Sequence, residues 1–313
     1  MVFNQPDTKN KAKYLMQRLL QKVINRLISP LLKIIRIQHK KRYARGEGIE
    51  PFISGDTFRD LADLRIDSKQ HFEKLKKSLD SSAIFCSNEV ANELVKEKHI
   101  PQKKVWIFHN GDTMITQAII NALGEQKAIF AQHLIGKSNQ SQCIPTGLEN
   151  ESWWNNGIAF DYHWLRRQKT SNRIARILWG FTVANNYQPR KMAAEVLQAY
   201  PLADRTSGWC SVIYRRILLK YMFVASPEGN GIDCHRTWEA MYLRTVPIVT
   251  RSPVTEFFVD LGLPMLMVDS WSDINKLNQN DLIGIYREKA LQFDNEALYF
   301  EFWKNKIKGE IHA

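Results

Sequence analysis

Between residues 221 and 250 the sequence predicts a strand, a glycine-bearing loop, a helix and a second strand in immediate succession. The apolar run 222–226 precedes the polar loop 227–233, about ten residues of helical pattern follow, and the β-branched run 246–250 ends the unit. Gly229 and Gly231 permit close approaches that a Cβ forbids, so amides of this loop and of the first helical turn can face a diphosphate. The stretch therefore predicts half of a nucleotide-binding sheet.

Polar side chains beside the loop are candidate ligands for a nucleotide. His235 and Arg236 lie in the first helical turn and can add positive charge, and the carboxylate of Glu239 can accept both hydroxyls of a ribose. A glycine-rich loop before a helix is also common as a simple chain reversal. On the loop alone, that interpretation stays open.

The full motif is more specific than the loop. It consists of SPEGNG at 226–231, Asp233, HRTWEA at 235–240 and VPIV at 246–249. Together these segments resemble the signature of exostosin-like glycosyltransferases, over roughly residues 176–256, although Arg244 stands where a glycine is usual. The resemblance implies a nucleotide-sugar donor site formed by Arg190, Ser226, Glu228, Gly229, Asn230, Gly231, Asp233, His235, Arg236 and Glu239. For Arg190, a solvated position at the start of a helix is an equal alternative.

A second resemblance lies at residues 145–150, PTGLEN, which is similar to a segment of bacterial surface-polysaccharide glycosyltransferases. Aromatic residues and amides follow at 153–156 and 162–164. Indole faces stack on sugar rings while amides bond their hydroxyls, but core packing explains the same aromatic residues equally well.

Apolar runs and helical patterns alternate along the rest of the chain. Strands are predicted at 52–53, 83–86, 105–108, 128–131, 174–181, 210–212, 222–226, 246–250 and 265–268, and helices around 58–64, 69–79, 88–98, 113–123, 191–198 and 296–307. Such alternation indicates parallel sheets covered by helices.

The predicted fold class is α/β, with two Rossmann-like domains in the GT-B arrangement, an N-terminal amphipathic helix and a C-terminal helix that packs back on the first domain. The expected divisions are a basic amphipathic membrane-associating segment (1–46), an N-terminal Rossmann-like acceptor domain (47–170), a C-terminal nucleotide-sugar-binding domain (171–295) and the C-terminal helix (296–313).

The N-terminal segment carries nearly all of the excess charge. Residues 1–46 contain twelve Lys or Arg residues and one acid, Asp7, so +11 of the formal net charge of +12 lies there. Residues 12–37 place an apolar stripe opposite a cationic face, which Pro30 should kink, without an 18-residue apolar window. This pattern favours a helix in the interface of an anionic membrane. Packing on the protein's own core and a mitochondrial presequence are the alternatives.

The nearly neutral body argues against a nucleic-acid groove, which would need basic charge over the folded surface. Cys86, Cys143, Cys210 and Cys234 form no Cys-x-x-Cys pair, which indicates neither a zinc site nor a disulfide framework and favours reduced thiols in the cytosol. We therefore expect a cytoplasmic protein that is peripheral on the membrane.

The catalytic residues are predicted from the two-domain arrangement. No Asp-x-Asp motif for a metal-bound diphosphate is present, so we expect a metal-independent reaction in which Arg236 stabilises the departing diphosphate. An inverting reaction needs a base from the first domain, and the candidates are Asp56, His109, Asp112, His133 and Glu149, with Asp56 and His109 foremost. An N-cap at Asp56 and a turn at 108–112 are the alternatives, and retention without a first-domain base stays open.

The favoured function is a glycosyltransferase that moves a sugar from a nucleotide-sugar donor to a glycan or lipid-linked glycan acceptor, with no cofactor besides the donor and no nucleic-acid partner. The alternative is a non-enzymatic protein that binds a membrane surface or nucleic acid through the basic arm. A sulfotransferase is a third hypothesis, disfavoured because the sequence has no Gly-x-x-x-x-Gly-Lys loop.

Overall fold

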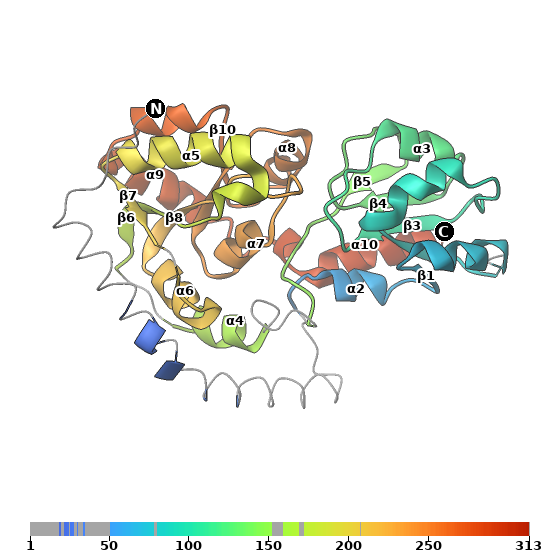
Figure 1. The fold of residues 1–313 in the computed structure, drawn as a ribbon, viewed down its shortest axis with the longest axis horizontal. Coiled ribbons are helices and arrows are strands. Elements are labelled where there is room, and N and C mark those ends of the chain that lie inside the picture. The colour runs from blue at the N-terminus through green and yellow to red at the C-terminus, as the bar shows by residue number, and fades with distance from the viewer. Residues whose placement is uncertain are drawn as a thin grey trace.

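The computed structural model describes residues 51–77, 80–151, 159–168, 172–206 and 208–312, together with positions 19, 22–24, 26, 27, 30 and 34. Two sheets of five parallel strands form the centres of two lobes (Figure 1). The C-terminal helix lies in the lobe of the first sheet. The predicted α/β class, with two Rossmann-like domains and a C-terminal helix that packs back, is therefore confirmed.

The first domain contains the strands in the order in which they follow along the chain, β1-β2-β3-β4-β5. Its elements, with 3₁₀ helices labelled η, are α2 (Gly55–Arg59), β1 (Leu64–Ile66), η1 (Lys69–Lys77), β2 (Ala83–Ser87), η2 (Asn88–Lys96), β3 (Val105–His109), α3 (Gln117–Leu123), β4 (Ala128–Ala131) and β5 (Ser141–Cys143). Right-handed crossovers in a sequential sheet place η1, η2 and α3 on one face. The other face is left to α2 and the C-terminal helix, which both contact β3.

The second domain has the strand order β10-β9-β8-β6-β7. Its elements are α4 (Ala159–Arg166), β6 (Ile174–Trp179), η3 (Val183–Asn186), α5 (Tyr187–Ala199), β7 (Ala203–Arg205), α6 (Ser211–Leu218), β8 (Tyr221–Ala225), α7 (His235–Tyr242), β9 (Val246–Thr250), α8 (Pro253–Asp260), β10 (Leu266–Val268), η4 (Trp271–Lys276), α9 (Gln279–Ala290), η5 (Glu296–Leu298) and α10 (Phe300–His312). The strand order reverses between β6 and β8. Ligands of α/β sheets bind at the carboxyl ends of the strands beside such a reversal. Here Asn186 and Arg190, which follow β6, donate to carbonyl groups of the loop that follows β8.

Most predicted elements are present, and three differ. Residues 52–53 form no strand; the following Ser54 caps α2 in a capping box with Thr57. The helix expected at 58–64 ends at Arg59, and Leu64 begins β1 instead. Residues 210–212 were predicted as a strand but begin α6, with Cys210 as its N-cap, because apolar positions recur three to four residues apart along 212–218.

Strand β7 was missed in the sequence because it has only three residues, none of them buried, and lies at the edge of the sheet. A short, half-exposed edge strand has no apolar run for periodicity to detect.

The two domains share one apolar core. One cluster of buried side chains runs from the first sheet through α7 and α8 to α10, and a smaller cluster lies between the second sheet, α5 and α9. At the junction the ring of Phe52 lies 4.8 Å from that of Tyr242, and the Ile53 amide donates to the Tyr242 hydroxyl at 3.1 Å. This packing joins the domains directly behind the site described below.

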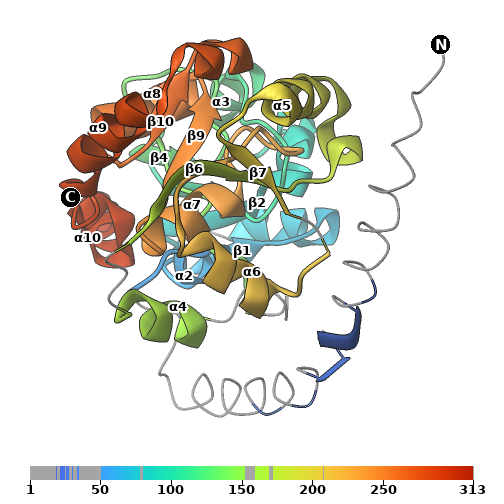
Figure 2. The same cartoon turned by 90° about the vertical axis from the view of Figure 1, so that its left-hand side faces the viewer.

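A buried ion pair fixes α4 to α6. Arg215 Nη1 donates to Asp161 Oδ2 at 3.0 Å, and Arg215 Nε donates to the Tyr162 hydroxyl at 3.0 Å. The two helices lie side by side in both views (Figures 1 and 2). Removing one partner of such a pair costs about 3–5 kcal/mol, so the segment between the sheets is anchored to the second domain.

The N-terminal segment and the tryptophans at 153 and 154 lie largely outside the described residues. Positions 19, 22–24, 26, 27, 30 and 34 are helical, and Leu19, Val23, Leu27 and Ile34 are exposed. None of the described helices combines the length and the apolar character that crossing a bilayer requires.

Candidate functional site

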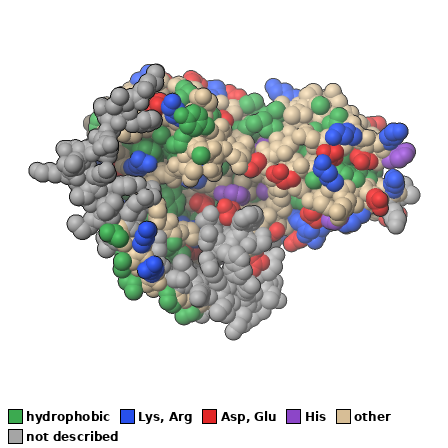
Figure 3. Space-filling view, in the orientation of Figure 1, with side chains coloured by type: hydrophobic (Ala, Val, Ile, Leu, Met, Phe, Trp, Pro, Cys, Tyr) green, Lys and Arg blue, Asp and Glu red, His purple; other side chains and the backbone are tan. Residues whose placement is uncertain are grey.

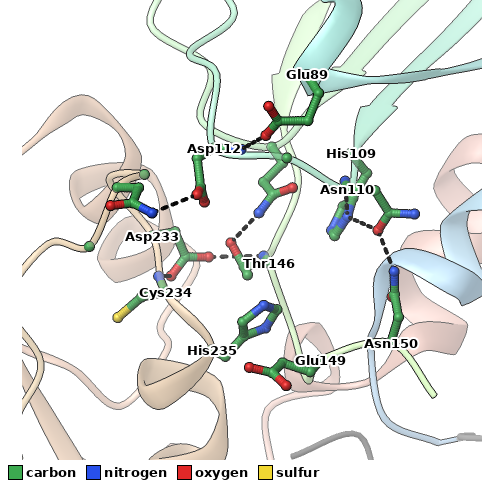
Figure 4. A pocket seen from close by; sticks show the side chains of 15 residues that line it. Glu89, His109, Asn110, Asp112, Thr146, Glu149, Asn150, Asp233, Cys234 and His235 are labelled. Atoms are coloured by element: carbon green, nitrogen blue, oxygen red, sulfur yellow. Dashed lines mark hydrogen bonds between the residues drawn. The ribbon is translucent and has the colours of Figure 1, made fainter. Parts of the chain in front are cut away.

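A cavity of about 450 Å³ lies where the two domains meet, at the carboxyl ends of β3, β4, β5 and β8. Acidic and histidine side chains gather in the hollow between the lobes (Figure 3). The lining consists of Glu89, His109, Asn110, Gly111, Asp112, Gln132, Thr146, Glu149 and Asn150 from the first domain and of Gly229, Asn230, Gly231, Asp233, Cys234 and His235 from the second (Figure 4). We call it the interdomain pocket.

His109 ends β3 and forms part of the pocket wall. Its Nδ1 accepts the Asn110 amide at 2.8 Å, so its proton lies on Nε2, which donates to the Pro145 carbonyl at 2.9 Å. Burial lowers the pKa of His109 to about 4. The ring is therefore neutral at pH 7 with both nitrogens engaged, and it orients the loop before Thr146.

Two carboxylates lie at the mouth of the pocket. Glu89 Oε1 accepts the Asp112 amide at 2.8 Å, and Asp112 Oδ2 accepts the side-chain amide of Asn230 at 3.0 Å. The bond between Asp112 and Asn230 crosses from one domain to the other (Figure 4).

Asp233 attaches the glycine loop to the first domain. Its Oδ2 accepts the Thr146 amide at 2.9 Å and Trp238 Nε1 at 2.7 Å, and its Oδ1 accepts the Cys234 amide at 2.9 Å. Burial raises the pKa of this carboxyl group. These three bonds connect Asp233 to the N-cap and the body of α7 and to the first domain, so the side chain positions the loop.

His133 contacts the same loop from behind. It has a left-handed backbone (φ 56°), is 1% exposed, and accepts the Asp233 amide on Nδ1 at 3.3 Å. Burial lowers its pKa to about 3. A Cβ on Gly231 would lie 2.2 Å from His133 Nε2, so the approach of the two domains requires glycine here.

Two arginines lie on the other side of the loop, beside the point where the strand order reverses. Arg190 donates from Nε to the Glu228 carbonyl at 2.8 Å and from Nη1 to the Thr182 carbonyl at 2.9 Å. Arg236 donates to the Gly180 carbonyl at 3.2 Å. Both guanidinium carbons lie 5.9 Å from the ring centre of Phe181, so the two charges flank one aromatic side chain.

Other predicted donor-site residues follow β8 along the loop and α7. The Ser226 hydroxyl is 2.9 Å from that of Thr237, and Glu228 Oε1 accepts the Thr250 hydroxyl at 3.2 Å. His235 Nδ1 donates to the Gly147 carbonyl at 2.9 Å. Glu239 is 7% exposed on α7 and does not line the interdomain pocket.

Asp56, the foremost candidate base, lies outside the lining of the pocket. Its amide donates to Asn150 Oδ1 at 2.9 Å, and its Oδ2 accepts the Glu151 amide at 3.0 Å. Burial raises the pKa of this carboxyl group. Asp56 therefore holds the loop that carries Glu149 and Asn150.

Sequence reasoning missed several lining residues, including Glu89, Gln132, Thr146 and Asn150. Gln132 directly follows β4, and its Nε2 donates to the Thr146 hydroxyl at 2.8 Å. The rule that ligands bind at the carboxyl ends of parallel strands could have identified Gln132. Glu89 lies on η2, and its approach to Asp112 depends on the packing of η2 against the loop that follows β3.

Within the described parts of the chain, no group of three or more His, Cys, Asp or Glu side chains could hold a metal ion. Metal independence of the reaction stays a prediction.

Comparison with known proteins gives a likeness in fold only. No protein family model matches the chain, and no curated protein sequence matches it. Among solved structures it is similar to the spinosyn rhamnosyltransferase SpnG, with a TM-score of 0.36 and 11% identity over 90% of this chain and 77% of that chain. The complex of that protein with thymidine diphosphate gives a TM-score of 0.33 and 10% identity over 90% of this chain and 78% of the other. A likeness of this degree places no residue and assigns no activity. Membership of the exostosin-like family thus stays a prediction from the motif.

Proposed function

We propose that the protein is a glycosyltransferase that moves a sugar from a nucleotide-sugar donor to a glycan or lipid-linked glycan acceptor. The observation that carries the proposal is the interdomain pocket. It is lined by hydrogen-bonding side chains of both domains, and the motif-bearing loop 227–233 separates it from the arginine pair at the reversal of strand order.

In this proposal the donor diphosphate lies beside Arg190 and Arg236, where the strand order reverses between β6 and β8. Arg190 and Arg236 supply positive charge there, and α7 begins at His235 with its amides at the same edge of the sheet. Glu239 lies one turn further along α7, where a carboxylate can accept ribose hydroxyls. Charge that develops on the departing diphosphate would be stabilised by Arg236 and Arg190 in a partly buried site.

The acceptor hydroxyl enters the interdomain pocket in this proposal. Glu149 lines the pocket beside His235 (Figure 4), and we assign it as the base. Asp56 lies outside the lining, and burial lowers the pKa of His109 to about 4, which makes its ring a weak base. A carboxylate in hydrogen-bond reach of the acceptor would take its proton as the glycosidic bond forms.

Association with an anionic membrane is a further part of this proposal. In the N-terminal helix the exposed apolar positions Leu19, Val23 and Leu27 alternate with the exposed cations Lys22 and Arg26. Such a helix binds anionic lipid through both apolar burial and charge. Deleting residues 1–46 should release the protein from anionic vesicles in a flotation assay, and unchanged binding would contradict the idea.

The central experiment is a panel of nucleotide sugars, read out by binding and by hydrolysis or transfer. Arg236→Ala should lower turnover by about 100-fold, because a donor of charge stabilisation is lost. Glu239→Ala should weaken donor binding by about tenfold, because a hydrogen bond to a charged group is lost. Arg287→Ala, which removes an exposed arginine from α9, is the matched control. Wild-type turnover in both test variants would remove these residues from the donor site.

Glu149 requires its own variant. Glu149→Gln keeps the size and the acceptor oxygen of the side chain but cannot take a proton, so transfer should fall by about 10²–10⁴-fold while donor affinity stays within about twofold. Transfer at the wild-type rate in this variant would exclude Glu149 as the base.

A further inference from the structure

The charge of the interdomain pocket differs from that of the region around Arg190 and Arg236. Four carboxylic side chains line the pocket: Glu89, Asp112, Glu149 and Asp233. The fifteen described lining residues include neither lysine nor arginine. His109 adds no positive charge at neutral pH, because burial lowers its pKa to about 4. Apart from His109 and His235, the ionisable side chains of oxygen or nitrogen acids and bases that line the pocket are therefore carboxylic, and they disfavour a further negative charge among them.

The cations lie on the far side of Gly229. A Cβ built on Gly229 would lie 3.2 Å from Arg190 Nη2, while the glycine itself lines the pocket. Loop 227–233 thus separates the arginines from the carboxylates. A nucleotide sugar whose diphosphate lies by Arg190 and Arg236 must place its sugar towards the carboxylates, since the reverse orientation would put its phosphates among like charges.

A buried amide in the pocket wall also specifies the ligand. Gln132 is 4% exposed and donates from Nε2 to the Thr146 hydroxyl at 2.8 Å. Its Oε1 is buried and has no hydrogen-bond partner among the described residues. The wall at this point is therefore neutral and polar, and it offers no positive charge to a carboxylate.

We propose that the pocket selects a sugar without negative charge, so that the donor is a nucleotide of a neutral or amino sugar and not of a uronic acid. The proposal rests on the proposed function, because it assumes that a nucleotide sugar binds. The repelling groups are Glu89 and Asp112 at the mouth, and the neutral polar wall is formed by Gln132 and Thr146.

The test uses pairs of donors that differ only at C6, where the neutral member has a hydroxymethyl group and the other a carboxylate: UDP-glucose against UDP-glucuronate, GDP-mannose against GDP-mannuronate, and dTDP-glucose against dTDP-glucuronate. Binding is measured by calorimetry on the full-length chain, and hydrolysis or transfer is measured in parallel. For the nucleotide that binds, the neutral member should bind about ten- to a hundredfold tighter than the uronate, because like charges meet in the pocket. Equal affinity, or tighter binding of the uronate, would overturn the proposal.

Two variants test whether the carboxylates of the pocket cause the preference for the neutral donor. Glu89→Gln and Asp112→Asn each remove a charge and keep an oxygen that accepts the hydrogen bond from the Asp112 amide or from Asn230. At low salt, each variant should reduce the ratio of the two affinities by about two- to fivefold. The effect is small because both carboxylates are exposed and their charges are screened. Glu93→Gln is the control, because Glu93 pairs with Lys69 and Lys96 outside the pocket. An unchanged preference in both test variants would overturn the assignment to these carboxylates.

The outcomes separate the two proposals. If no nucleotide sugar of any pair binds, the proposed function fails and this inference fails with it. If neutral and uronate donors bind equally well, glycosyl transfer stands and only the charge selection is wrong.

Discussion

The two sheets have equal numbers of parallel strands but are connected in different ways. The first is sequential, β1 to β5, whereas the second reverses its direction between β6 and β8. The arginine pair lies at this reversal, where Arg190 donates to a carbonyl of the loop after β8 and Arg236 donates to a carbonyl that follows β6. The sequential sheet has no reversal, and its contribution to the site is the row of polar residues that follow β3, β4 and β5.

The difference extends to what covers each sheet. Successive right-handed crossovers leave one face of the first sheet to α2 and α10, two elements from opposite ends of the described chain. The first sheet therefore depends on residues more than 190 positions away in sequence. The second sheet is covered on both faces mainly by helices from its own crossovers.

The largest expected effect tests this dependence. Phe300 on α10 is 4% exposed and meets the ring of Phe58 edge-on at 5.7 Å. Phe300→Ala should lower the free energy of unfolding by about 3–5 kcal/mol through the lost contacts and the cavity. Hydrogen exchange should rise more in β3 than in β6. Phe302→Ala, at a half-buried neighbour, is the control, and equal exchange in both sheets would contradict the dependence of the first sheet on α10.

The second largest effect is expected from acid, through two buried histidines of the first domain. The folded-state pKa values of His109 and His133 are about 4 and about 3, below the ordinary 6.5, because burial disfavours the charged ring. The unfolded chain takes up protons below pH 6.5 that the folded chain does not, so stability is retained above pH 6.5 and lost as the pH falls. At about 1.4 kcal/mol per pH unit, each buried ring should lower the free energy of unfolding by about 3 kcal/mol at pH 4, relative to pH 7.

Urea unfolding at pH 7, 5.5 and 4.5 checks this expectation. The carboxyl group of Asp233 acts in the opposite direction, because its raised pKa means that the folded chain takes up that proton first. His133→Asn, which suits the left-handed backbone, should remove about half of the histidine-dependent slope, whereas His312→Asn at an exposed site should change nothing. A stability that does not decrease between pH 7 and 4.5 would contradict the role of the buried rings.

Gly231 tests the place where the two domains meet. Gly231→Ala would put a Cβ 2.2 Å from His133 Nε2, so the loop or the histidine must move. The free energy of unfolding should fall by about 1–3 kcal/mol. Turnover of the donor should fall by more than this loss of stability alone would cause. Gly284→Ala is the control because nothing lies within 4 Å of its Cβ, and it should raise stability by about 0.5–1 kcal/mol inside α9. A Gly231→Ala protein as stable and active as wild type would show that close contact at this point is dispensable.

The smallest expected effect concerns the second domain alone. Arg244 has a left-handed backbone (φ 57°) between α7 and β9, which explains why glycine is usual there in the family that the motif resembles. Arg244→Gly should raise the unfolding free energy by up to about 1 kcal/mol, less the small contribution of its exposed pair with Asp294. Arg244→Ala loses the pair and keeps the strain, so it should be less stable than wild type. The reverse order of the two variants in urea unfolding would disprove this explanation.

Much of this protein could be predicted from its sequence by local rules. The buried strands at 83–87, 105–109 and 246–250 are continuous apolar runs, and the α/β class follows from their alternation with helices. The motif loop and α7 were also predicted, because glycines and a helical pattern are local signals. By contrast, Leu64 and residues 210–212 were misassigned, since short elements depend on capping and on what they pack against.

The candidate site was decided by the tertiary structure. Sequence spacing indicates that His109, Gln132, Thr146 and Glu149 follow strands, but only parallel pairing of those strands brings them to one edge, opposite a loop that lies about a hundred residues later. The separation of arginines from carboxylates by loop 227–233 also depends on contacts between distant segments, such as Asp233 with Thr146 and Asp112 with Asn230. Local periodicity determines which residues form strands and helices, whereas the packing of the two sheets determines which charges share a cavity.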